Sequence, residues 1–381
     1  MSDKSMEFYK DPVNFCTSRI HNTGSRVFQA RLLNKPTVFV CSVKGMKEML
    51  VDKKYHIVRL CPTREEAHLL RLSLMQLFKE KSLDAYGDYI NSSEPVAIYR
   101  LFKRLATELS LGLFLNVDAE ESAALTKQII QLTTQHWHGK STIILMVCPH
   151  MHLKKLFLTR LKLKLIGKCV QTCFNLNRFV NKIKNIPFPE NTSATQHLLL
   201  FISALIPKAL ASLLTSFTLA LAGSNQIHIH KCAQESEDYL NNVLLEVQRL
   251  WPSFIGGRRI AKQDTTLCGY MIPKGYSVMF IAFAVHRDPD YFDHPDEFLP
   301  ERWSERNAGQ ENVLCCFGNG PRNCIGIELN NMIVKAAARY LLSHYTWSLD
   351  PPTQTLDYKW LPVSRPAEDP TIKFMSYFCQ T

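Results

Sequence analysis

The sequence predicts a mainly α-helical fold with a minor β region, organised as one domain over residues 1–381. Two observations carry this prediction. Hydrophobic residues recur at helical spacing through most of residues 61–250, whereas strand-like stretches are confined to residues 1–60 and 251–381. No repeat of fixed period and no low-complexity linker divides the chain, and its hydrophobic content of 46% with 21% charged residues is typical of a folded protein.

The β part of residues 1–60 is predicted from one stretch, RVFQARLLNKPTVFVCS, at residues 26–42. Its hydrophobic and polar residues alternate, which is the pattern of a half-buried strand. Asn34, Lys35 and Pro36 interrupt the alternation with turn-forming residues. We therefore expect two strands separated by these three residues.

Residues 61–250 change to the helical period. In TREEAHLLRLSLMQLFKEKSL, residues 63–83, Thr63 can cap a helix, and Glu65 and Glu66 follow in the first turn, where the helix dipole favours negative charge. Helical patterns continue to about residue 249. This region is expected to form the α-helical bulk of the domain.

Residues 251–381 mix both patterns. The segment TTLCGYMIPKGYSVMFIAFAVH, residues 265–286, reads as strands with turns at Gly269 and at residues 273–275. The segment IELNNMIVKAAARYLLSHY, residues 327–345, predicts a last long helix. Between them lies the glycine-rich stretch CCFGNGPRNCIG, residues 315–326.

The cysteine content and the first residues indicate the cellular compartment. The chain has 12 cysteines without a repeating framework, and its start, MSDKSMEFYKDPVNF, is polar and charged rather than a secretory signal. We therefore expect reduced thiols that face the cytosol. No window of 18 apolar residues is free of charge, so no membrane-spanning helix is predicted.

The net charge of +11 is concentrated in residues 151–188, which contain nine basic residues and no acidic one. A solvated helical face would explain this charge, and so would peripheral contact with an anionic membrane through interleaved leucines. A basic face could also attract an acidic electron donor. Sparse aromatic residues and the lack of a binding fold argue against nucleic acid.

The glycine-rich stretch suits thiolate ligation of a metal. Cys324 comes just before the last predicted helix, whose amino terminus favours negative charge and lowers the pKa of a cysteine there. Gly318, Gly320 and Gly326 would let the backbone approach a bulky planar group. Arg322, two residues before the cysteine, could pair with a carboxylate.

Three motifs in this region resemble those of the cytochrome P450 family. Phe317-x-x-Gly320-x-Arg322-x-Cys324-x-Gly326 is similar to the heme-binding signature of that family. Glu246-x-x-Arg249 in LLEVQRLWP resembles its helical Glu-x-x-Arg motif, and FLPERW at residues 298–303 resembles its Pro-Glu-Arg segment. The motifs occur in the order of the family, and the resemblance is strong over residues 238–374.

The resemblance implies a cytochrome P450 fold that binds heme b. Cys324 would be the proximal thiolate ligand of the iron and the catalytic centre. Glu246, Arg249 and Arg302 would form a buried structural charge cluster. The remaining heme-binding residues implied by the resemblance are Phe317, Gly326 and three arginines that would pair with the heme propionates, namely Arg322, Arg259 and Arg71.

Two other cysteine-containing motifs receive simpler interpretations. Cys315 and Cys316 precede the loop and are expected to pack as small hydrophobic residues. The stretch HIHKC, residues 228–232, could suggest zinc, but it lacks a second cluster at ligand spacing. We expect it to be a solvated loop.

The helix that should face the heme departs from the pattern of the family. In ALIPKALASLLTSF, Pro207 and Lys208 replace the acid and the threonine that relay protons to oxygen. The proline is expected to kink the helix. Ser212 or Thr215 would have to supply a hydroxyl in a shifted register, or water would have to do so, or the protein does not cleave dioxygen.

The resulting expectation is a monooxygenase that inserts one oxygen atom into a sterol, retinoid or fatty acid. The resemblance implies a flavoprotein reductase as electron donor and a place on the cytosolic face of the endoplasmic reticulum membrane. Two alternatives stay open. One is an oxygen-independent isomerase or dehydratase of lipid peroxides, and the other is an amino-terminally shortened, non-catalytic form. The pocket is expected to be lined by residues 198–222, the loop after Pro252 and residues 362–365.

Overall fold

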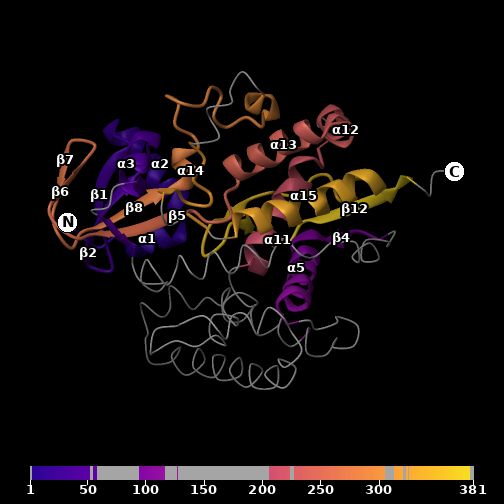
Figure 1. The fold of residues 1–381 in the computed structure, drawn as a ribbon, viewed down its shortest axis with the longest axis horizontal. Coiled ribbons are helices and arrows are strands. Elements are labelled where there is room, and N and C mark those ends of the chain that lie inside the picture. The colour runs from indigo at the N-terminus through magenta and orange to yellow at the C-terminus, as the bar shows by residue number, and fades with distance from the viewer. Residues whose placement is uncertain are drawn as a thin grey trace.

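The computed structural model describes residues 2–51, 55–57, 94–115, 127, 206–223, 227–304, 313–320, 323–324 and 326–377. Arg71, Arg322 and the basic segment 151–188 lie outside these residues. The described helices and strands form a β-rich part that holds the amino terminus, on the left of Figure 1, and a helical part on the right. The predicted fold class, mainly α with a minor β region, agrees with this arrangement.

A five-stranded sheet, in the order β1-β2-β8-β5-β3, organises the β-rich part. Its strands are antiparallel except for the parallel pair β2 and β8. The bounds are β1 (Val27–Leu32), β2 (Lys35–Val40), β3 (Tyr55–Ile57), β5 (Gly256–Ala261) and β8 (Ser277–Ile281). The sheet thereby joins residues 27–57 to residues 256–281, far apart in the sequence.

The turn between β1 and β2 differs from the prediction. It consists of Leu33 and Asn34, both with positive φ (54° and 57°), and Lys35 and Pro36 already belong to β2. A two-residue turn of this kind matches the twist of a hairpin. Pro36 is tolerated because β8 pairs with β2 only from Thr37 onward. The alternation in the sequence could not show where this pairing begins.

Four short helices flank the five-stranded sheet, namely α1 (Ser5–Lys10), α2 (Pro12–Thr23), α3 (Val43–Val51) and α14 (Ala282–Val285). One aromatic cluster packs α1 and α2 against β2, where Phe8 and Phe15 both contact Phe39. The hairpin of β6 (Thr265–Leu267) and β7 (Tyr270–Ile272) precedes β8. Its turn contains Gly269 with φ 81°, and Gly275 has φ 85°, so both predicted turn positions are confirmed.

Among the described helices, α5 (Ile98–Leu115), α11 (Ile206–Ala220), α13 (Glu237–Leu250) and α15 (Ile327–His344) form the helical core (Figure 1). Their apolar faces meet in one hydrophobic cluster. A sheet of β4 (Val96–Ala97), β12 (Thr371–Ser376) and β9 (Tyr345–Leu349) and a pair of β10 (Tyr358–Lys359) and β11 (Arg365–Pro366) complete this part. No helix within the described ranges is long and apolar enough to cross a membrane.

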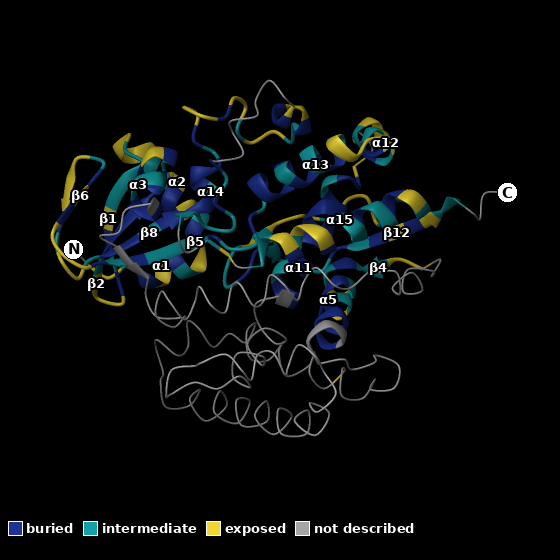
Figure 2. Ribbon diagram, in the orientation of Figure 1, coloured by how far each residue is buried: buried dark blue, intermediate teal, exposed yellow. Residues whose placement is uncertain are grey.

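The motif HIHKC is helical rather than a loop. It lies in α12 (Ile227–Glu235), so the predicted solvated loop is wrong. One side of the helix is anchored, because His230 is buried and its ring centroid lies 4.6 Å from that of Trp347. The other side is exposed (Figure 2). Polar histidines concealed this amphipathic pattern in the sequence.

Candidate functional site

A cavity of about 750 Å³ lies where the two parts of the fold meet. Its walls come from α11, from the end of α13 and the loop that follows, from β5 and β8, and from the glycine-rich loop before α15. Its size is that of a pocket for a large organic ligand. Apolar residues form most of the wall, including Leu50, Leu210, Leu213, Phe254, Phe280, Leu329 and Ile333.

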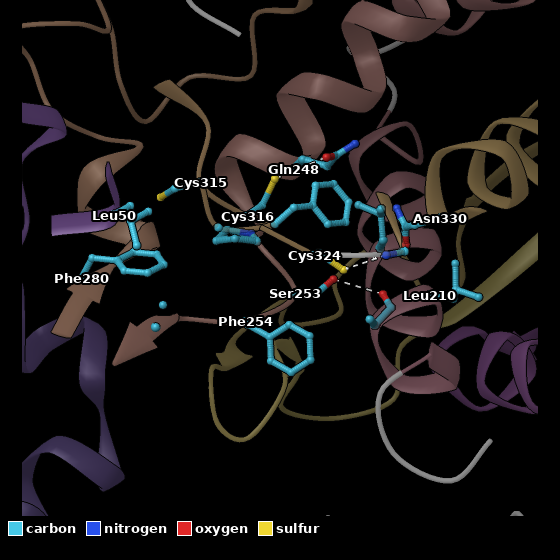
Figure 3. Close-up of a pocket in the computed structure, with 18 of the residues that line it drawn as sticks. Leu50, Leu210, Gln248, Ser253, Phe254, Phe280, Cys315, Cys316, Cys324 and Asn330 are labelled. Carbon is cyan, nitrogen blue, oxygen red and sulfur yellow. Dashed lines mark hydrogen bonds between the residues drawn. The ribbon is translucent and has the colours of Figure 1, made fainter. Parts of the chain in front are cut away.

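Cys324 presents its sulfur to this cavity (Figure 3). Its own backbone N–H donates to the carbonyl of Phe317 at 2.7 Å, which closes the glycine-rich loop. Its Sγ accepts the N–H of Gly326 at 3.3 Å. Because Gly326 is the N-cap of α15, the sulfur lies at the amino terminus of that helix, where negative charge is stabilised.

Glycines give the loop its shape. Gly318 and Gly320 have φ values of 72° and 71°, a region in which other residues are strained. Phe317 and Gly318 both line the cavity. The structure thereby explains the Phe-x-x-Gly part of the motif as backbone geometry.

Arg259 enters the cavity wall from β5 and is 7% exposed. Its neighbour Arg258 also lines the cavity and donates to the hydroxyl of Ser277. Four of the predicted site residues therefore surround one cavity, namely Phe317, Cys324, Gly326 and Arg259. The other two, Arg71 and Arg322, lie outside the described residues.

Sequence reasoning missed the role of Gly256 and Gly257 at the start of β5. Both line the cavity, and a Cβ atom on Gly256 would lie 1.9 Å from the carbonyl oxygen of Phe280. A side chain on Gly257 would meet the ring of Phe280 at 2.6 Å. Side chains at these positions would displace β8, so the glycine pair before Arg258 was the signal that could have shown this wall.

The cavity-facing side of α11 is apolar. Ala209, Leu210 and Leu213 line the cavity, which confirms part of the predicted lining at residues 198–222. The hydroxyl of Ser212 instead lies 3.1 Å from that of Ser364, and Thr215 is fully buried outside the lining. Neither hydroxyl faces the cavity. The structure therefore does not place Ser212 or Thr215 where the threonine of the family would stand.

Lys208 is 1% exposed and is not part of the described cavity lining. Burial, together with the charges of Lys103 and Arg365, lowers the pKa of Lys208 to about 6. The loop after Pro252 lines the cavity as predicted, through Ser253 and Phe254. The described lining does not include residues 362–365, and Ser364 lies against Ser212 instead.

Both cysteines before the loop line the cavity (Figure 3). Cys315 is buried, as predicted, and its N–H donates to Nε2 of His286 at 2.9 Å. Cys316 is half-buried, and its thiol lies 3.4 Å from Oε1 of Gln248. Each cysteine thus has a polar contact in addition to the expected packing.

Glu246, Arg249 and Arg302 form a buried charge cluster, as the motifs predicted. The carboxylate of Glu246 accepts two hydrogen bonds from Arg249, at 2.8 and 2.9 Å, and one from Arg302 at 3.0 Å. It also accepts the indole N–H of Trp303 and the backbone N–H of Leu299, each at 2.9 Å. Glu246 and Arg249 are both fully buried, which excludes a surface ion pair.

Both arginines continue the cluster into the backbone of residues 286–297. Arg249 donates to the carbonyl oxygens of His286, Pro295 and Glu297, at 2.6 to 2.9 Å. Arg302 donates to those of Asp293 and His294. The cluster thereby joins α13 to the 3-10 helix η5 (Pro300–Trp303) and fixes the irregular segment between them.

His286 connects the cluster to the cysteine loop. Its Nδ1 lies 3.1 Å from the carbonyl of Arg249, and its Nε2 accepts the N–H of Cys315. This pattern requires the neutral ring with the proton on Nδ1. Burial lowers the pKa of His286 to about 3, and the positive charges of Arg249 and Arg287 add to that effect.

The fold and the site define a mainly α protein with one cysteine set at a helix amino terminus in an apolar cavity. The sequence profile of the cytochrome P450 family matches residues 189–374. Cytochrome P450 3A31 of Mesocricetus auratus is 37% identical over 170 residues, which are 44% of this chain and 33% of that protein. The lithocholate 6-beta-hydroxylase of the same animal is 41% identical over 111 residues, 29% of this chain and 22% of that protein.

The overall fold is likewise that of a cytochrome P450. The structure of retinoic acid-bound cyanobacterial CYP120A1 superimposes with a TM-score of 0.78, covering 98% of this chain and 96% of that one, at 21% identity. Residues 189–374 are therefore similar in sequence, and the whole chain in fold, to the cytochrome P450 family, whose cofactor is heme. The aligned part spans a third or less of the curated relatives described above.

Removing the carboxylate of Glu246 should destabilise the protein strongly. The variant Glu246→Ala leaves Arg249 and Arg302 buried without their counter-charge, which should lower the free energy of unfolding by about 3 to 5 kcal/mol. Urea unfolding measures this. The control Glu297→Gln removes an exposed carboxylate and should change the value by less than about 0.5 kcal/mol. Equal losses in both variants would contradict the role of the cluster.

The stability of the protein should also depend on pH through His286. The pKa of His286 is about 3 in the folded protein and about 6.5 in the unfolded chain. Between these two pH values the unfolded state therefore binds a proton at this ring, and the folded state does not. The free energy of unfolding should therefore fall as the pH drops from about 6.5 toward 3, by up to about 1.4 kcal/mol per pH unit.

His286→Gln should remove this contribution, whereas His21→Gln, which changes an exposed histidine, should leave it in place. Urea unfolding at a series of pH values compares the slopes. An unchanged slope in His286→Gln would show that the ring is protonated in the folded protein.

Proposed function

We propose that this chain is a heme-thiolate monooxygenase that inserts one oxygen atom into a lipophilic substrate. The observation that carries the proposal is the position of Cys324, whose sulfur lines an apolar cavity of about 750 Å³ at the amino terminus of α15. A thiolate in that position would hold a heme iron suited to oxygen activation. The similarity to the cytochrome P450 family supports the same conclusion.

The residues present fit a heme. Cys324 offers a soft sulfur ligand, and the N–H of Gly326 already donates to that sulfur, which would stabilise its negative charge. Gly256 and Gly257 line the cavity and let β5 lie close to β8, where a Cβ atom would collide with Phe280. The large apolar lining matches a planar macrocycle.

The proposed roles follow from position and charge. Cys324 would hold the iron, and Phe317 and Gly326 would frame it. The guanidinium of Arg259 would pair with a propionate, since it is a permanent cation in the cavity wall. Arg322 and Arg71 are proposed as further propionate partners on their sequence motifs alone.

The protein itself would supply binding, orientation and exclusion of water. Bound heme supplies a redox-active iron that activates oxygen. Leu210, Leu213 and Phe254 present apolar surface that would hold a lipophilic substrate and keep water out. Gln248 and Asn330 are polar groups in the described lining that could orient a substrate oxygen.

The proposed partners and location rest on the family. A flavoprotein reductase would provide electrons, and residues 151–188 would contact an anionic membrane on the cytosolic face of the endoplasmic reticulum. The substrate class is proposed as sterol, retinoid or fatty acid. The names of two similar proteins, a lithocholate hydroxylase and a retinoic acid-bound structure, support that range.

One observation favours a second candidate, an oxygen-independent rearrangement of lipid peroxides. In the described part of α11, the cavity-facing residues are Ala209, Leu210 and Leu213, none of which can relay a proton. Such a rearrangement needs no protons delivered to dioxygen and no external electrons. Both candidates use the same cysteine and the same heme.

A carbon monoxide difference spectrum of the reduced protein tests heme-thiolate binding. We expect the red-shifted band that is typical of a thiolate ligand, and its loss in Cys324→Ser. Cys316→Ser and Cys315→Ser are matched controls that should keep the band, because the first thiol faces Gln248 and the second is buried. A missing band in the native chain would favour the non-catalytic alternative, and a band unchanged in Cys324→Ser would overturn the ligand assignment.

The electron requirement separates the two reactions. We expect product from a lipophilic substrate only with a flavoprotein reductase, its reduced cofactor and dioxygen, since monooxygenation consumes two electrons per turnover. A fatty-acid hydroperoxide supplied without reductase is the comparison. Rapid rearrangement of the hydroperoxide in the absence of dioxygen, with no reductase-dependent product, would establish the second candidate.

A further inference from the structure

The exposed face of α12 carries a histidine and a cysteine in contact. His228 and Cys232 lie one helical turn apart, and the Sγ atom is 3.6 Å from Nε2 and 3.8 Å from Nδ1 of the imidazole. Side chains four residues apart lie above one another on a helix, so the backbone itself holds them together. The histidine is exposed and the cysteine half-buried, so both can be reached from solvent.

These distances fit joint coordination of a metal ion. In tetrahedral zinc sites the metal lies about 2.3 Å from sulfur and about 2.0 to 2.1 Å from nitrogen, which places the two ligand atoms about 3.5 Å apart. Paired ligands at positions i and i+4 of a helix are also the arrangement found in helical zinc sites. A rotation of the exposed imidazole would direct a nitrogen lone pair at the ion without moving the backbone.

The charged neighbours of the pair are engaged with other groups. Tyr239 donates its hydroxyl to Glu301, and Arg339 donates to the carbonyl of Gln234 in α12. The nearby Lys231 is directed toward Glu235, with Nζ 4.0 Å from the carboxylate oxygen.

Packing of the opposite face of α12 keeps the side chains of His228 and Cys232 on the outer side of the helix. His230 and Ala233 are buried, and His230 packs on Trp347. The helix therefore cannot turn His228 and Cys232 inward. Figure 2 shows this exposed face of α12 at the outer surface of the molecule, at the top right.

We propose that His228 and Cys232 together bind a divalent ion of the zinc type on α12. Thiolate and imidazole select zinc and related borderline-soft ions over magnesium and calcium. No group of three or more metal-binding side chains occurs within the part of the chain that the structure describes, so water would complete the coordination. The site is separate from the heme cavity, and its existence does not depend on the proposed function.

Protection of Cys232 from alkylation tests this site in the full chain. The protein is stripped with a chelator, incubated with or without zinc chloride, and treated with iodoacetamide, and each cysteine is followed by peptide mass spectrometry. Zinc should slow the alkylation of Cys232 severalfold, because coordination occupies the thiolate lone pair. A chelator should restore the rate.

The controls separate specific binding from adventitious binding. His228→Ala should abolish most of the protection at Cys232, and because the ring is exposed, this variant should unfold at the same urea concentration as the native chain. Cys268, a half-buried thiol in a β-turn, should alkylate at the same rate with and without zinc. Zinc binding measured by equilibrium dialysis should fall by one ion per chain in both His228→Ala and Cys232→Ser. Absent protection of Cys232, or equal protection in the native chain and in His228→Ala, would overturn the proposal.

Discussion

The fully buried carboxylate of Glu246 is the interaction on which the rest of the site depends. It accepts five hydrogen bonds, with donors in α13, in η5 and in the backbone of Leu299, the N-cap of η5. Arg249 is the largest fully buried side chain among the described residues, and it extends the cluster to three backbone carbonyls. Buried charges are costly unless they are paired in this way, so the cluster accepts only one arrangement of the segments around it.

From this cluster, a short series of contacts reaches the candidate iron ligand. Arg249 orients His286 through both backbone and ring, and His286 in turn accepts the N–H of Cys315. Cys316 contacts Gln248 on the same turn of α13. The loop that follows is closed by the hydrogen bond from Cys324 to Phe317. The position of the sulfur is therefore set by a series of contacts that begins in the buried charge cluster.

The sequence was sufficient wherever chemistry is local. Cys324, Phe317 and Gly326 share one short motif, and the cluster of Glu246, Arg249 and Arg302 was implied by the two further motifs that resemble those of the family. Reasoning from the sequence was insufficient where a structural feature depends on contacts between residues far apart in the sequence. The start of β2 depends on where β8 begins to pair, and the helical state of residues 227–235 depends on packing against Trp347. The polar contacts of Cys315 and Cys316 are with His286 and Gln248. None of these partners is adjacent in the sequence.

The apolar face of α11 indicates less about the reaction than the cysteine loop indicates about the cofactor. Its cavity-facing side chains exclude water, while its hydroxyl and amino groups are directed into the protein, as Ser212 and Lys208 show. The central claim concerns the cofactor: the sulfur of Cys324 binds the iron. X-ray absorption at the iron edge of the heme-loaded protein tests it most directly. We expect one sulfur neighbour of the iron in the native chain and in Cys316→Ser, and none in Cys324→Ser. An iron coordinated by nitrogen and oxygen alone in the native chain, or a sulfur neighbour that survives in Cys324→Ser, would contradict the account.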